Sequence, residues 1–229
     1  ISYFDTLLKL SIALQFPWRI SAMKSNLSMY GYNHHGMIAQ GYQTSADALR
    51  IAEESGDIYS KAMAYSSHGA SCYCKGLLKE AEQYLNTGVN LTEKIDMFAH
   101  NAMAHQYLGH VFFDQGQYQE AKEHYAKAIY VRQHSRLFPS SANLNKIALI
   151  RASLLNGEKD IDIESMYRFV ERNRVRLYEG CLARYIADIM LHLDAHEMQK
   201  TEDWIVKAIE ADNRNKMQCD LGMDYILYG

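Results

Sequence analysis

The sequence predicts an all-α protein built as a solenoid of antiparallel helix pairs. Two sets of residues recur every 40 positions: Gly36, Gly76 and Gly116, and Met23, Met63 and Met103. Self-similarity at a fixed period of roughly 20–50 residues is typical of repeat architectures. Only two prolines occur and no clear alternating apolar runs are present, so helices are favoured over strands.

Composition narrows the class of protein further. The chain has 229 residues, a net charge of −3 and a 48% share of hydrophobic residues, enough for a sizeable core. A nucleic-acid binder normally carries a basic stripe, which is missing, and no apolar run is long enough for a transmembrane helix. The four cysteines form no metal-binding or disulfide pattern. We therefore expect a cytoplasmic protein with reduced thiols that binds neither nucleic acid nor membrane.

Taken in order, the elements form one solenoid fragment over residues 1–229. The opening segment resembles the second helix of a preceding pair, and both ends fall inside helical patterns, which predicts excision from a longer protein. In the fourth unit we expect a turn at Asn156-Gly157 and a helix over about 162–178. The predicted units are 1–20 (partial), 22–60, 62–100, 101–138, 140–179, 181–214 and 215–229 (partial).

The unit at 101–138 shows the pattern most clearly. Its second helix carries apolar or small residues at the three-and-four spacing of one helical face, and a glycine ends its first helix. The residues in question are Leu108, Gly109, Phe112, Gly116, Tyr118, Ala121, Tyr125 and Ala128.

These residues resemble the tetratricopeptide repeat (TPR) in identity, order and interval. His105 stands where the family prefers tryptophan. The 40-residue period is longer than the usual repeat and is similar to that of maltose-activator-type and other large bacterial signalling proteins. The resemblance implies a right-handed superhelix whose first helices line a concave, partner-binding groove.

Transferring the groove positions of that family gives the candidate site. The predicted partner-binding residues are Met23, Asn26, Tyr30, Asn33, Met63, Ser66, Tyr73, Met103, Gln106, His110 and Phe113. Methionine adapts to irregular apolar surfaces, although methionines at helical spacing also serve simply as packing. The lysines and asparagines with which some family members clamp a peptide carboxylate are absent, so chaperone C-termini are not expected as ligands.

No residue pattern predicts catalysis. Phosphate loops, nucleophile elbows and dinucleotide fingerprints are missing. His192 and His196 share a spacing suited to a metal, but no third ligand accompanies them. Cys72 falls at a packing position. We expect no enzyme activity, cofactor or metal.

One basic cluster stands out, formed by Arg168, Arg172, Arg174 and Arg176. It could contact an anionic partner or form a solvated face paired with Glu171 and Glu179.

The predicted function is therefore non-catalytic: a protein-interaction or regulatory segment of a larger cytoplasmic signalling or transcription-regulatory protein. It would bind a peptide, a partner or a domain of its own parent chain. Two alternatives stay open. The first is a small-ligand sensor, which an apolar cavity within 140–200 would favour. The second is a homodimerisation scaffold, which exposed tyrosines on the terminal repeats would favour.

Overall fold

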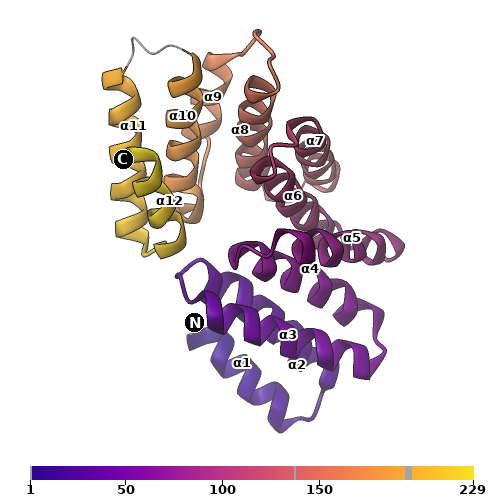
Figure 1. The fold of residues 1–229 in the computed structure, drawn as a ribbon. Coiled ribbons are helices and arrows are strands. Elements are labelled where there is room, and N and C mark those ends of the chain that lie inside the picture. Colours follow the sequence, from indigo (N-terminus) through magenta and orange to yellow (C-terminus); the bar gives the residue numbers. More distant parts are fainter. Residues whose placement is uncertain (1, 137, 194–197) are drawn as a thin grey trace. The chain divides into compact units, whose positions relative to one another are not determined.

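The computed structural model describes residues 2–136, 138–193 and 198–229, and every regular element in these ranges is helical (Figure 1). The all-α prediction is confirmed. The elements are α1 (Ser2–Ala13), α2 (Pro17–Asn26), the π-helix η1 (Leu27–Asn33), α3 (Ile38–Ser55), α4 (Ile58–Cys74), α5 (Leu78–Lys94), α6 (Phe98–Asp114), α7 (Tyr118–Ser135), α8 (Pro139–Leu155), α9 (Ile163–Glu171), the 3₁₀-helix η2 (Arg176–Tyr178), α10 (Glu179–Leu193), α11 (Met198–Asn215) and α12 (Gln218–Tyr228).

The chain divides into two compact units, Ile1–Val111 and Phe112–Gly229. In the first unit α3 packs on the continuous helix formed by α2 and η1, and α5 packs on α4. In the second unit α8 packs on α7, and α10 packs on α11. We call α2 with η1, α4, α6, α8 and α10 the first helices, and α3, α5, α7, α9 and α11 the second helices. That the whole chain forms one solenoid stays a prediction.

Glycines end successive first helices in the left-handed conformation. The φ angles of Gly36, Gly76, Gly116 and Gly157 lie between 74° and 90°. At Gly116 the backbone N–H donates to the Phe113 carbonyl over 3.0 Å, and the next N–H donates to the Phe112 carbonyl over 2.8 Å. Glycine adopts this conformation without steric cost, so the 40-residue glycine spacing marks the turn of each pair.

Small residues let the helices of the first unit approach closely. Ala48 and Ala52 of α3 are fully buried against Ala64 of α4. A Cβ atom added to Gly88 of α5 would lie 2.6 Å from the Ser66 hydroxyl and 3.0 Å from the Ser66 nitrogen of α4. These small residues are therefore contact points between helices.

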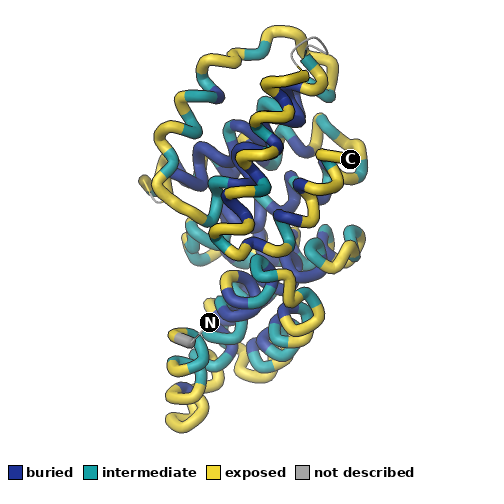
Figure 2. Tube along the Cα trace, turned by 90° about the vertical axis from the view of Figure 1, so that its left-hand side faces the viewer, coloured by how far each residue is buried: buried dark blue, intermediate teal, exposed yellow. Residues whose placement is uncertain are grey.

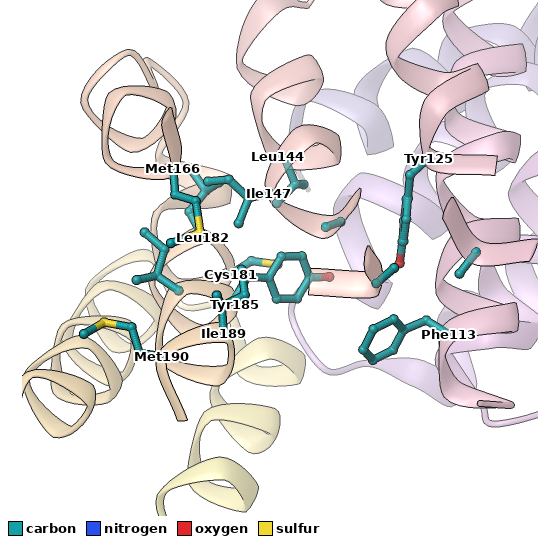
Figure 3. Packing of buried hydrophobic residues seen from close by; sticks show 14 residues of the cluster. Phe113, Tyr125, Leu144, Ile147, Met166, Cys181, Leu182, Tyr185, Ile189 and Met190 are labelled. Carbon is teal, nitrogen blue, oxygen red and sulfur yellow. The ribbon is translucent and has the colours of Figure 1, made fainter. Parts of the chain in front are cut away.

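The second unit has a larger apolar core, shown in Figure 3. Tyr125 of α7, Ile147 of α8, Met166 of α9 and Leu182 of α10 are almost wholly buried there. Each such side chain contributes roughly 1.5–3 kcal/mol on burial. Along the helices buried stretches alternate with exposed ones, as Figure 2 shows, which is the pattern of amphipathic helices.

The predicted helix over 162–178 is wrong in its second half, because α9 ends at Glu171. Asn173 follows, and its side-chain oxygen accepts the N–H of Val175 over 3.1 Å while its Nδ2 donates to the Val175 carbonyl over 3.0 Å. Such asparagine turns compete with helical hydrogen bonds. The N–H of Arg174 then donates to the Ser140 hydroxyl of α8 over 3.0 Å, which holds the chain in an irregular path.

Candidate partner-binding surface

The helix formed by α2 and η1 leaves three of its predicted residues accessible and buries one. Met23 and Asn26 are partly buried, and Tyr30 is 44% exposed. Asn33 is buried: its Nδ2 donates to the Ser71 hydroxyl of α4 over 3.0 Å, and its amide fills the space beside Gly41. Tyr30 and Asn33 both lie in η1, whose wider turns shift side chains away from the α-helical face that the sequence predicted.

The second predicted level lies on α4. Ser66 is fully buried at the approach of Gly88, and its hydroxyl donates to the Ala62 carbonyl over 2.8 Å. Met63 and Tyr73 stay partly accessible. The serine therefore serves helix packing, and the methionine and tyrosine remain available for contact with a partner.

Aromatic rings of α4 and α6 lie close together. The Tyr73 ring lies 5.7 Å from both the Tyr107 and His110 rings, and the latter two rings are 5.6 Å apart. Tyr107 was missed by sequence reasoning, although its spacing of three residues from His110 places both on one helical face. Gln106 and His110 are partly accessible, and Met103 is buried.

Phe113 belongs to the second unit and is only 8% exposed. Its ring meets the Tyr118 ring edge-on at 5.3 Å, and the Arg151 guanidinium lies 3.9 Å from its centre. This phenylalanine packs in the core shown in Figure 3.

Seven of the predicted residues are accessible, at least in part. We call this set the first-helix surface: Met23, Asn26, Tyr30, Met63, Tyr73, Gln106 and His110. It contains no lysine, arginine, aspartate or glutamate, although these make up 22% of the chain. The surface is therefore aromatic and polar but carries no fixed charge.

A buried histidine and cysteine lie beneath this region and are unsuited to nucleophilic chemistry. His68 Nδ1 lies 2.9 Å from the Ser45 hydroxyl, and its Nε2 lies 3.8 Å from the Cys72 sulfur. Burial lowers the pKa of His68 to about 4 and raises the pKa of Cys72 to about 11. At neutral pH the imidazole is neutral and the thiol is protonated, whereas a reactive cysteine needs its thiolate.

A second buried polar cluster fastens α12 to its neighbours. Arg184 of α10 donates to Asp220 over 2.9 Å and to Asp224 over 2.8 Å, both on α12. Asp212 of α11 is fully buried beside them, against Gly180. Burial, together with the neighbouring carboxylates, raises the pKa of Asp212 to about 8. One guanidinium thus faces three carboxyl groups.

The two histidines with metal-binding spacing, His192 and His196, are not both among the described residues. His192 Nδ1 lies 2.7 Å from the Asp188 carbonyl oxygen, and His196 falls outside the described residues. Within residues 2–136, 138–193 and 198–229, no group of three or more His, Cys, Asp or Glu side chains is placed to hold a metal ion. None of the helices in these ranges combines the length and apolar character needed to cross a bilayer.

Comparison with known proteins supports the repeat assignment. Residues 102–133 match the model of the tetratricopeptide repeat. A crystal structure of nearly identical TPR-like repeats, described as a kinesin light chain of Podosopora anserina, is similar in fold, with a TM-score of 0.59 and 16% identity, and the match covers 87% of this chain and 98% of that one. A variant of that protein with one glutamine replaced by methionine matches with the same score and identity over 87% and 97%. No curated protein matches the sequence.

The chain thus contains a tetratricopeptide repeat at residues 102–133 within an all-α, TPR-like repeat fold. Repeats of this family generally mediate contacts between proteins. The narrower likeness to maltose-activator-type proteins stays a prediction.

Proposed function

We propose that this chain is a non-catalytic protein-interaction segment of a larger cytoplasmic signalling or transcription-regulatory protein. It binds a peptide, a partner protein or another domain of its parent chain. The observation that carries this proposal is the first-helix surface, where Tyr30, Tyr73 and His110 stay accessible on successive first helices. Tyrosines of this kind supply large contact areas at interfaces at a low entropic cost.

The chemistry of this surface restricts its partner. Because the surface carries no fixed charge, recognition rests on apolar and aromatic side chains and on neutral hydrogen bonds. Interactions between exposed charges weaken with added salt, whereas apolar contacts do not. We expect the affinity for the partner to change less than about threefold between low and physiological salt, because the surface offers no ion pairs for salt to screen.

Site-specific crosslinking tests the proposal. A photoreactive phenylalanine analogue is placed at Tyr30, and in a control at Tyr130, which is 68% exposed on the second helix α7. In cells we expect one partner to crosslink from Tyr30 and not from Tyr130. Equal crosslinking from both positions would contradict a specific surface.

The same partner then serves in a binding assay. Tyr73→Ala should raise its Kd about tenfold or more, since a contact tyrosine in an interface contributes about 1.4 kcal/mol or more. Gln106→Lys, which adds a charge without removing a ring, should weaken binding as well. The far-ultraviolet circular dichroism of both variants serves as the folding control. If both variants fold and their Kd values are unchanged, the partner does not bind at the first-helix surface and the proposal is refuted.

The structure offers one observation in favour of the dimerisation alternative. Tyr3 is 72% exposed, and Tyr225 and Tyr228 are 54% and 50% exposed. Light scattering across a hundredfold range of protein concentration tests this function. A mass that doubles with concentration, and that returns to one chain in Tyr225→Ser, would favour the scaffold.

The small-ligand alternative has less support. The pocket formed by α9, α10 and α11 holds about 270 Å³, and five of its lining residues are charged or polar. An enclosed apolar cavity, which a sensor of this kind requires, is not what these residues form.

A further inference from the structure

The second unit carries an excess of positive charge at one end. The turns between α7 and α8, between α9 and α10, and between α11 and α12 hold six exposed cations and two acidic residues. The cations are Arg136, Arg172, Arg174, Arg176, Arg214 and Lys216. At the opposite end of the unit, residues 156–164 hold four exposed acids and one lysine. The net charge of −3 for the chain therefore averages over two ends of opposite charge.

The three basic turns lie next to one another. The Arg174 N–H donates to the Ser140 hydroxyl at the start of α8 over 3.0 Å, and the Asn215 side chain donates to the Arg176 carbonyl over 3.0 Å. In Figure 1 the start of α10 and the turn between α11 and α12 lie at the same end of the unit. We call residues 134–136, 138–139, 171–179 and 213–218 the basic end.

Most of these cations have no acidic partner within the chain. Arg214 pairs with Glu179 over 2.7 Å. The Arg174 guanidinium donates to the backbone carbonyls of Glu171 and Asn173. Among the described residues, no carboxylate lies within 4.0 Å of the other four cations. The face paired with Glu171 and Glu179 that the sequence allowed is therefore formed only by Arg214, and the remaining charge faces solvent.

Exposed apolar side chains lie among the cations. Phe138, directly before α8, is 56% exposed, and Val175 is 37% exposed between two of the arginines. The exposure of Phe138 reflects its place in the repeat, because the same position of earlier units also holds an exposed apolar residue. Those residues, at intervals of 40, are Trp18, Ile58 and Phe98.

We propose that the basic end docks the second unit on the surface of a bilayer that contains anionic phospholipids. The arginines bind lipid phosphates, which guanidinium groups recognise through paired hydrogen bonds. Phe138 enters the boundary between headgroups and acyl chains, where apolar side chains of peripheral proteins are buried. The opposite charges of the two ends of the unit orient the basic end toward the anionic surface.

A bilayer fits this end better than a nucleic acid does. The cations and Phe138 lie on turns at the ends of helices, whereas a single strand is bound in a groove that follows its backbone. Apolar side chains flanked by cations match a membrane surface, where phosphates lie just above hydrocarbon. The expectation that no membrane is bound came from the charge of the whole chain and from the lack of a long apolar run. Neither quantity describes binding by one end of a unit.

Vesicle flotation tests the proposal. The protein is mixed with vesicles of phosphatidylcholine alone, and with vesicles in which about a third of the lipid is phosphatidylserine. We expect the protein to float only with the anionic vesicles. The bound fraction should fall severalfold between about 0.05 M and about 0.5 M salt, because salt screens the attraction between arginines and lipid.

Charge reversal locates the site. Arg172→Glu with Arg176→Glu should lower the vesicle partition coefficient at least tenfold. The matched control, Lys127→Glu with Lys159→Glu, makes the same change in net charge on exposed residues of this unit outside the basic end, and it should change the coefficient less than threefold. Far-ultraviolet circular dichroism checks the fold of each variant. Phe138→Ser, which should also weaken partitioning, gives an independent test if the arginine variant unfolds.

A tryptophan at the basic end distinguishes a bilayer from soluble headgroups. Phe138→Trp adds a third tryptophan to Trp18 and Trp204, and the wild type serves as the reference for those two. We expect additional blue-shifted emission with anionic vesicles. Inorganic phosphate and glycerophosphoserine should cause no such shift, because only a bilayer offers an apolar layer to the new indole.

Several outcomes would overturn the proposal. It fails if the protein floats with both kinds of vesicle or with neither, if the lysine control weakens partitioning as much as the arginine variant, or if the emission of Phe138→Trp does not respond to anionic vesicles. It also fails if a single-stranded oligonucleotide or polyglutamate at equal charge concentration removes the protein from the vesicles. Dimerisation that the arginine variant abolishes would assign the basic end to a second copy instead. None of these results would alter the crosslinking expected from Tyr30.

Discussion

Replacing Asp212 with asparagine should make the protein more stable, by an amount that grows as the pH rises from about 4 to about 8. Asp212 is fully buried and neither of its oxygens accepts a hydrogen bond from a described donor. It faces Asp220 and Asp224 of α12, with Arg184 as the cation among them. The protonated carboxyl is the form that this environment favours.

The magnitude follows from proton linkage. The folded-state pKa of Asp212 is about 8, whereas an unfolded aspartate titrates near 4. Between these values the folded state holds a proton that the unfolded state has released, so the free energy of unfolding falls as pH rises. The loss is at most roughly 1.4 kcal/mol per pH unit, or about 3 kcal/mol between pH 5.5 and 8. Asparagine cannot titrate and still offers an N–H to Asp224.

Urea unfolding followed by circular dichroism at about pH 5.5 and pH 8.5 measures this difference. Asp203→Asn serves as the control, because Asp203 lies on the same helix but is exposed. We expect the stability gain of Asp212→Asn over the wild type to grow with pH, and the control to follow the wild type. Equal destabilisation by Asp212→Asn at both pH values would refute the reasoning.

Three further predictions concern the fold. Gly116→Ala should lower the free energy of unfolding in urea by about 1–2 kcal/mol, because the added Cβ has open space but the φ angle is +74°. Gly222→Ala in α12 is the control, and it should be neutral or stabilise the protein by up to about 1 kcal/mol. Leu85→Ala should cost about 2–5 kcal/mol in the same assay, since Leu85 is fully buried. Cys72 and Cys181 should react with iodoacetamide only after unfolding, because burial raises their pKa values to about 11 and about 12, and rapid labelling of the folded protein detected by mass spectrometry would contradict this.

The sequence pattern was sufficient to predict the turns of the fold, because each turn depends on one local requirement. A residue in the left-handed backbone conformation must end each first helix, and glycine meets that requirement at Gly36, Gly76 and Gly116. The small residues Ala121 and Ala128, both part of the sequence pattern of the unit at 101–138, are fully buried as well. These positions could be identified without any knowledge of neighbouring helices.

The candidate site was harder to predict, because its residues depend on helix geometry beyond their own segment. Transferring positions by spacing assumes a regular α-helix, and η1 departs from that geometry at Tyr30 and Asn33. The end of α9 at Glu171 depends on an asparagine turn and on a hydrogen bond from Arg174 to Ser140 of another helix. A helical hydrophobic pattern over 162–178 carries no information about either.

Two of the polar candidates, Asn33 and Ser66, are buried for a shared physical reason. Asn33 fills the space beside Gly41, and Ser66 lies against Gly88, so each polar side chain of a first helix occupies the gap left by a glycine of the next helix. A glycine that permits close approach also draws in the side chain facing it, and a buried polar group must then find its hydrogen bond within the protein. The Tyr30 ring is too large for such a gap, and it stays exposed.

Recognition by the first unit should therefore depend on aromatic rings rather than on these two polar side chains. Some family members clamp a peptide carboxylate with lysines and asparagines of the groove, but here the polar positions Asn33 and Ser66 serve packing. An aromatic surface without fixed charges selects its partner by shape and apolar contact.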